Sequence, residues 1–169
     1  QIIFHRHYRW TNEIFPKFKI KVTNKDELKN KLISKYEQLL KTYILNAELS
    51  PYLSDFKKKY NSKNWIMISG SEENELREIL KKKGISNLFN LGIYGSPLTK
   101  DFLLKKKITD YEIKFPAIFF GDSKVDYFAA KKANIEFIFL YEWTDLENWK
   151  KFCNLNKINF AKNLGDLLN

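Results

Sequence analysis

The sequence contains little cysteine, histidine, glycine and arginine. It has one Cys, two His and six Gly in 169 residues, and only three of its basic residues are Arg. One cysteine excludes an intramolecular disulfide framework, and so few Cys and His residues disfavour a structural zinc site. No apolar run comes near the length of a membrane span, about 18 residues, and no signal-peptide pattern opens the chain. We therefore expect a cytoplasmic protein with no membrane partner.

The abundant residues indicate a folded domain with a basic surface. Hydrophobic residues make up 44% of the chain and aromatic residues 16%, enough for the core of one domain or of one domain with a small inserted module. The net charge of +10 is also what a nucleic-acid-binding module would show. Such a module predicts a continuous lysine face with interleaved aromatic residues, whereas these lysines are scattered around the predicted helices. We therefore expect no nucleic-acid partner.

Residues 1 to 63 have the spacing of helices. Apolar residues recur at helical intervals over 26–46, and Asn24 or Asp26 is suited to cap that helix. Pro51 fits the first turn of a short helix over 52–60. Apolar residues over 3–18 form a rough helical stripe that breaks near Pro16. The pattern predicts a helical unit over 1–63.

From residue 64 onward, short apolar runs alternate with helical segments. The runs are 65–68, 91–94, 117–120 and 135–140. The predicted helices are 72–83, 99–107, 123–133, 145–152 and 164–168. Strands that are apolar on both faces and alternate with helices favour an α/β fold, with a Rossmann-like parallel sheet and helices on both faces. Ligands bind such sheets beyond the carboxyl ends of the strands, so the polar residues there are candidates for function.

Two of these strand ends carry groups suited to bind an anion. Ser69 and Gly70 follow an apolar run, where a hydroxyl and backbone N–H groups can hold an anion at a helix N-terminus. Lys100 stands near the start of a helix, where its charge opposes the helix dipole and suggests another use, such as binding a phosphate. Each signal is weak alone, because a plain strand-to-helix cap and a solvated lysine explain them equally well.

A third strand end carries two acids, Asp122 and Asp126. Carboxylates four residues apart on a helix share a face and repel each other when they are unpaired. A Mg²⁺ ion, which prefers carboxylate, water and phosphate oxygens, would relieve that repulsion. The alternative interpretation makes Asp122 a helix N-cap and Asp126 a surface acid.

In their order along the chain, these residues resemble the motifs of the haloacid dehalogenase superfamily of phosphohydrolases. WIMISG with Ser69 is similar to the second motif, GSPLTK with Lys100 to the third, and AIFFGDSKVD with Asp122 and Asp126 to the fourth. The resemblance covers residues 64 to about 145. A phosphoacceptor receiver domain also uses Asp, Ser or Thr, and Lys, but it lacks the Gly-Asp-x-x-x-Asp after the Lys.

The resemblance implies Mg²⁺-dependent hydrolysis of a small phosphorylated metabolite through an aspartyl-phosphate. It makes Ser69, Gly70 and Lys100 phosphate-binding residues, and it makes Asp122 and Asp126 the metal-site residues, with Asp126 holding the ligand, its waters or Lys100 in place. It also implies a helical cap over residues 1–63 and a core over 64–169. The stretch FHRHYRW looks like the cap start of members similar to phosphoglycolate phosphatases.

The first motif of the family, an Asp-x-Asp that supplies the nucleophile, occurs nowhere in the sequence. Two explanations compete. In the first, residues 2–7 are that strand, both Asp are replaced by His5 and His7, and the protein is an inactive binding or regulatory relative. In the second, residues 1 to about 20 belong to the cap, and the catalytic strand lies upstream of Gln1. We prefer the second explanation, because residue 1 is not Met and the stripe is helical. Because that strand is central in the family's sheet, the remaining strands are expected to leave two open edges.

Overall fold

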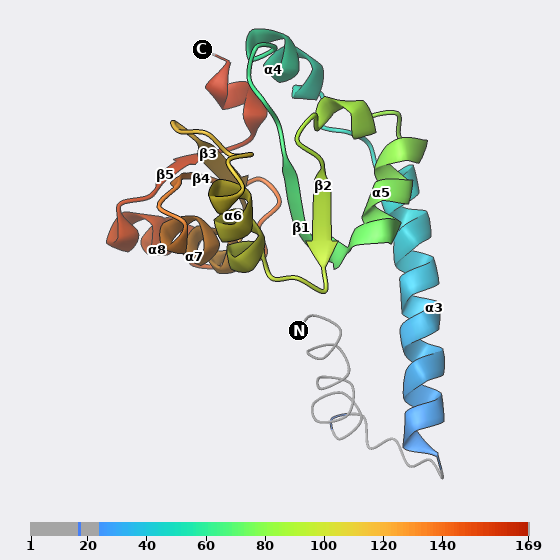
Figure 1. The fold of residues 1–169 in the computed structure, drawn as a ribbon. Coiled ribbons are helices and arrows are strands. Elements are labelled where there is room, and N and C mark those ends of the chain that lie inside the picture. Colours follow the sequence, from blue (N-terminus) through green and yellow to red (C-terminus); the bar gives the residue numbers. More distant parts are fainter. Residues whose placement is uncertain (1–16, 18–23, 169) are drawn as a thin grey trace.

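The computed structural model describes residue 17 and residues 24–168 (Figure 1). The predicted helical stripe over the first residues, and the alternative in which residues 2–7 form a strand, fall outside the described residues except for Lys17. The first long element is helix α3, Lys25–Asn46, which begins where the Asn24 side chain accepts a hydrogen bond from the Glu27 N–H. The predicted helix and one of its two predicted caps are thus confirmed.

Helix α3 is fastened at its carboxyl end and projects beyond the strands at the other (Figure 1). The Lys83 ammonium donates to the backbone carbonyls of Leu45 and Ala47, at 3.2 and 2.5 Å. Lys41 also pairs with Glu78 at 2.5 Å. A lysine on the final carbonyls of a helix satisfies acceptors that have no partner within the helix, so this contact fixes where α3 ends.

Helix α4, Leu53–Lys59, lies against the end of the chain rather than along α3. Tyr60 donates its hydroxyl to the Leu167 carbonyl at 3.3 Å, and the Phe56 ring meets Trp65 and Phe120 edge-on. The helix predicted over 52–60 is therefore present and packs on the α/β part of the chain. The boundary at residue 63 between a cap and a core stays a prediction.

In the described part of the chain, five strands form two parallel sheets. Strands β1, Met67–Glu72, and β2, Ile93–Ser96, make one sheet. Strands β3, Ile118–Gly121, β4, Glu136–Leu140, and β5, Asn159–Ala161, make the other in the order β3-β4-β5. The parallel α/β prediction is confirmed. Strand β5 was not predicted, because three residues are too short to show a periodicity.

The remaining helices connect and cover these strands. They are α5, Glu73–Lys82, α6, Lys100–Thr109, α7, Lys124–Lys132, and α8, Trp149–Asn156, with short 3₁₀ turns η2, Ser86–Leu88, and η3, Leu164–Leu167. Helix α6 packs on β1, α7 packs on β3 and β4, and the two helices pack on each other. The predicted helix 145–152 begins four residues later, at Trp149.

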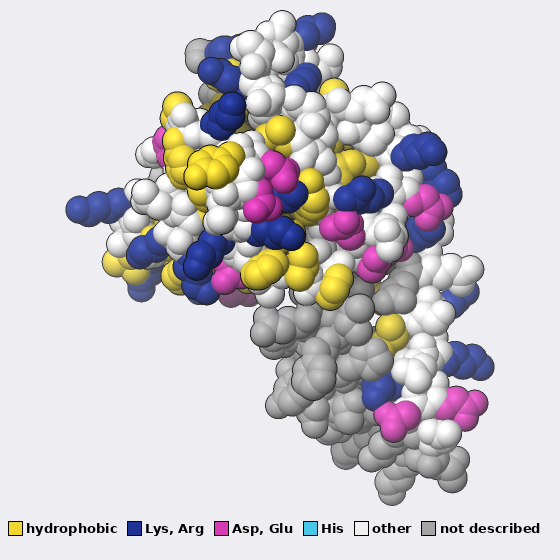
Figure 2. Space-filling model, in the orientation of Figure 1, with side chains coloured by type: hydrophobic (Ala, Val, Ile, Leu, Met, Phe, Trp, Pro, Cys, Tyr) yellow, Lys and Arg dark blue, Asp and Glu magenta, His cyan; other side chains and the backbone are white. Residues whose placement is uncertain are grey.

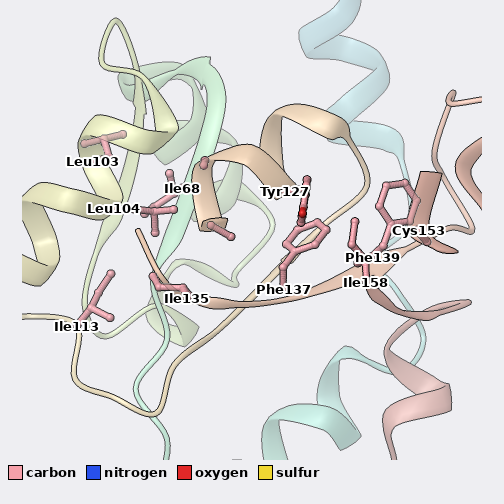
Figure 3. Packing of buried hydrophobic residues seen from close by; sticks show 12 residues of the cluster. Ile68, Leu103, Leu104, Ile113, Tyr127, Ile135, Phe137, Phe139, Cys153 and Ile158 are labelled. Atoms are coloured by element: carbon pink, nitrogen blue, oxygen red, sulfur yellow. The ribbon is translucent and has the colours of Figure 1, made fainter. Parts of the chain in front are cut away.

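The buried core spans both sheets (Figure 3). Ile68 of β1 and Leu104 of α6 meet the aromatic cluster built on β4, where Phe139 is fully buried and stacks on Trp149. Cys153 is also fully buried, and this burial raises the pKa of its thiol. A buried thiol with a raised pKa is a packing residue rather than a nucleophile.

The side of the molecule shown in Figure 2 carries basic and acidic side chains together. On the side shown in Figure 2, lysines are spread over the molecule with acidic side chains among them. On this side the distribution agrees with the scattered lysines of the sequence, and the expectation of no nucleic-acid partner stays a prediction. Among the described residues, no helix has both the length and the apolar character needed to cross a membrane.

Candidate active site

Lys100 and Asp126 meet where α6 and α7 begin. Thr99 caps α6 and Ser123 caps α7, which places these two residues in the first turns of neighbouring helices. The Lys100 ammonium forms an ion pair with Asp126 Oδ1, and the Asp126 side chain is 2% exposed. Lys100 follows β2 and Asp126 follows β3, so their contact brings the carboxyl ends of the two sheets to the same side of the molecule.

The Asp126 carboxylate is engaged through both oxygens. Oδ1 takes the Lys100 ion pair, while Oδ2 accepts hydrogen bonds from the Ser123 hydroxyl at 2.7 Å and from the backbone N–H groups of Ser123 and Asp122 at 3.2 and 3.3 Å. Ser123 Oγ in return accepts from the Asp126 N–H, which completes a capping box. The interpretation of Asp122 as N-cap and Asp126 as a surface acid is therefore wrong: Ser123 is the cap, and Asp126 is buried.

Asp122 presents its carboxyl group beside this buried acid. The residue remains accessible to solvent. Partial burial, followed by the negative charge of Asp126, raises the pKa of the Asp122 carboxyl above its usual range, although Lys100 acts in the opposite direction. A carboxylate that is costly to ionise next to a second acid is an environment in which a cation is favourable. Its main chain is also held, because the Thr144 hydroxyl donates to the Asp122 carbonyl at 2.6 Å.

Ser69 and Gly70 lie in an irregular part of β1. Ile68 pairs with Tyr94 and Glu72 with Ser96, so β1 contains two more residues than β2 between these two pairs. Ser69 Oγ accepts from the Ser71 N–H at 3.1 Å, which leaves the Ser69 hydroxyl hydrogen to donate elsewhere. Gly95 lies opposite, where a Cβ would come within 2.4 Å of the Ser71 carbonyl oxygen, so only glycine fits.

No strand of one sheet pairs with a strand of the other within residues 24–168. Among the described residues, β1 pairs only with β2, and β3 only with β4. Strands β1 and β3 therefore each have one edge without a ladder partner. Helices α6 and α7 pack on each other and cover both sheets. The open edges match the expectation from the missing Asp-x-Asp strand. Ser69 and Gly70 stand on one sheet, and Asp122 follows the other.

Asp126 thus contacts two of the other four predicted site residues, the Lys100 ammonium and the Asp122 backbone N–H. Within the described part of the chain, Ser69 and Gly70 form no hydrogen bond or ion pair with them. Sequence reasoning missed Thr144, and it noted Ser123 at a strand end without giving it a role. The Ser-x-x-Asp spacing of a capping box was a readable signal for Ser123. Thr144 carried none, because its contact joins residues 22 positions apart.

Gly121 is a position where substitution tests this packing. A Cβ there would lie 2.4 Å from Asp126 Cβ and 2.7 Å from Asp126 Oδ2. Because Asp126 is fixed by its five contacts, Gly121→Ala is expected to push that side chain away from Lys100 and to destabilise the fold by about 1–3 kcal/mol. Urea unfolding at neutral pH measures the change. A wild-type free energy of unfolding in this variant would show that the Asp126 side chain can move without loss of stability.

Solved structures of other proteins show which fold this chain has. A haloacid dehalogenase-like family hydrolase from Streptococcus pneumoniae matches 96% of this chain and 79% of its own, with a TM-score of 0.69 and 19% identity. The chain has the haloacid dehalogenase-like fold. A structure assigned as a phosphatase from Clostridium difficile matches 96% of this chain and 77% of its own, with a TM-score of 0.71 and 16% identity.

A third structure with the haloacid dehalogenase-like fold, a superfamily hydrolase from Ehrlichia chaffeensis, matches 98% of this chain and 84% of its own, with a TM-score of 0.58 and 19% identity. No family model and no curated protein matches the sequence. At these identities the similarity establishes the fold. The narrower resemblance to phosphoglycolate phosphatases stays a prediction.

Proposed function

We propose that this chain provides the core of a Mg²⁺-dependent phosphatase for small phosphate monoesters. The observation that carries the proposal is the meeting of Lys100, Asp122 and Asp126 at the carboxyl ends of the strands. A lysine ammonium beside two carboxylates is a combination suited to phosphate and a divalent cation. The haloacid dehalogenase-like fold, which the S. pneumoniae hydrolase shares, supports the same reaction class.

In this proposal, Ser69, Gly70 and Lys100 bind the phosphoryl oxygens. The Ser69 hydroxyl is oriented as a donor because its oxygen accepts from the Ser71 N–H. The Lys100 ammonium is held in place by Asp126, so its charge does not have to be organised when negative charge develops on the phosphoryl group. Donors fixed in advance stabilise the transition state more than donors that must rearrange.

The acids fit Mg²⁺ unequally. Asp122 fits as a ligand, because it is accessible to solvent and the raised pKa of its carboxyl reflects a charge that a cation would stabilise. Both Asp126 oxygens are already engaged, which favours its role in holding Lys100 and the Asp122 backbone. The described residues contain no cluster of three or more metal-binding side chains, so further ligands would come from outside them, from substrate and from water. The bound ion would neutralise charge on the phosphoryl group.

The nucleophile is proposed to be an aspartate on one further strand, paired between the open edges of β1 and β3. Its carboxylate oxygen would form a bond to phosphorus while the bond to the ester oxygen breaks, and that oxygen would take a proton and leave as an alcohol. Water would then cleave the aspartyl-phosphate to release phosphate and restore the carboxylate. A strand in that position would stand between Ser69 on β1 and Asp122 after β3.

Supplying that strand tests the proposal. A short apolar segment ending in Asp-x-Asp is fused ahead of Gln1, and the matched control carries Asn in place of the first Asp. We expect Mg²⁺-dependent phosphate release from p-nitrophenyl phosphate, sugar phosphates or phosphoglycolate with the Asp segment, and none with the Asn segment or with EDTA. Hydrogen exchange at β1 and β3 reports whether the segment pairs there. Pairing without any release would contradict the function, and failure to pair would contradict the position of the strand.

A further inference from the structure

We infer that Thr144 is a positioning residue for Asp122, an inference that rests on the proposed metal-binding role of Asp122. Thr144 lies in the loop between β4 and α8, outside the three motifs that the sequence suggested. Its hydroxyl fixes one side of the peptide group that joins Asp122 to Ser123. The orientation of this peptide decides where the Asp122 carboxylate stands.

Both polar atoms of that peptide group are held by side chains. The carbonyl oxygen, which belongs to Asp122, accepts from Thr144 Oγ1 at 2.6 Å. The N–H, which belongs to Ser123, donates to Asp126 Oδ2 at 3.2 Å. The two side chains come from different elements, so rotation of the peptide plane would break contacts to both. These two hydrogen bonds, from Thr144 and to Asp126, form a clamp on the peptide group. The clamp restricts the backbone dihedral that sets the direction of the Asp122 side chain.

Asp122 needs this support because it has few other contacts, such as the hydrogen bond from its own N–H to Asp126 Oδ2 at 3.3 Å. Strand β3 has four residues, and its edge facing away from β4 has no ladder partner among the described residues. Asp122 follows its last residue and is accessible to solvent. A metal ligand must be held within about 0.5 Å of its working position, which requires supporting contacts around it.

The loop that carries Thr144 is itself anchored. Thr144 Oγ1 accepts from the Leu146 N–H at 3.2 Å, so its hydrogen is directed to the Asp122 carbonyl. Two residues earlier, the Glu142 carboxylate accepts from Asn163 at 3.0 Å, and the Asn163 residue is 5% exposed. The Glu142 N–H also donates to the Lys162 carbonyl at 3.0 Å. Thr144 is thus a fixed point rather than part of a free loop.

Three variants separate the clamp from general stability. Thr144→Val removes the hydroxyl, Thr144→Ser keeps it, and Thr109→Val removes a hydroxyl that bonds the Lys105 carbonyl at 3.0 Å in α6. In the metal-free protein we expect the Ser123 amide to exchange about tenfold faster in Thr144→Val, relative to the Ala129 amide, and at the wild-type rate in the other two. Unchanged exchange of Ser123 in Thr144→Val would overturn the inference.

A Mg²⁺ titration, followed by the NMR shifts of the Asp122 and Ser123 amides, tests the consequence. We expect a midpoint about tenfold higher in Thr144→Val, with Thr144→Ser and Thr109→Val near wild type. A wild-type midpoint in Thr144→Val would overturn the inference and leave the proposed function intact. If neither the wild-type protein nor its fusion with the Asp-x-Asp segment responds to Mg²⁺, the metal assignment of Asp122 fails, while the exchange comparison still decides whether Thr144 holds the peptide.

Discussion

Asp122→Asn is expected to lower Mg²⁺-dependent turnover about 100-fold or more in the protein that carries the fused Asp-x-Asp segment. An amide oxygen is a weaker ligand than a carboxylate, and metal stabilisation of transition-state charge is worth several kcal/mol, with each 1.4 kcal/mol giving a factor of ten. Steady-state phosphate release at saturating substrate measures the loss. A full rate in this variant would contradict the assignment of Asp122 as the metal ligand.

The same variant is expected to fold at least as stably as the wild type. Because the pKa of Asp122 is raised in the folded state, the folded protein binds this proton more tightly than the unfolded chain. Its contribution to stability is therefore present below the unfolded pKa and is lost as the pH rises through the folded pKa. At neutral pH the carboxyl group of Asp122 is ionised at a cost in folding free energy, and Asp122→Asn removes this cost. The expected gain in the free energy of unfolding is no more than about 1 kcal/mol, because the group is accessible to solvent. Urea unfolding at pH 7 without Mg²⁺ measures this effect.

Asp126→Ala is expected to destabilise the fold by about 3–5 kcal/mol. The substitution leaves the Lys100 ammonium, whose side chain is 20% exposed, without its partner, and it removes the acceptor of the Asp122 and Ser123 N–H groups. Breaking a buried ion pair by removing one member carries a cost of this size, a large fraction of the total stability of a domain. Urea unfolding followed by circular dichroism measures it.

A second ion pair between the same two helices provides the matched control for Asp126→Ala. Asp101 of α6 pairs with Lys132 of α7 at 2.9 Å, but the side chains are 37% and 69% exposed. Asp101→Ala is therefore expected to change stability by less than about 1 kcal/mol. Equal losses from the two substitutions would show that pairing between the helices, rather than the burial of Asp126, carries the effect.

The sequence predicted the elements of the fold well because they are set by local patterns. Apolar runs and helical periodicity located α3, α5, α6, α7 and four of the five strands. The strand ends led to the prediction of Lys100, Asp122 and Asp126 as site residues, because parallel strands present their carboxyl ends to one side. The boundaries shifted where the periodicity was weak: β1 continues through Ser69 to Glu72, and α8 begins at Trp149.

The sequence by itself determined the α/β class, the order of the motifs and the absence of an Asp-x-Asp, since these depend on residue type and spacing alone. Only the tertiary structure decided that Asp126 is buried against Lys100, that Thr144 holds the Asp122 carbonyl, and that β1 and β3 present unpaired edges. The two contacts join residues 26 and 22 positions apart, and they and the unpaired edges arise from how helices and strands pack, which no local pattern records.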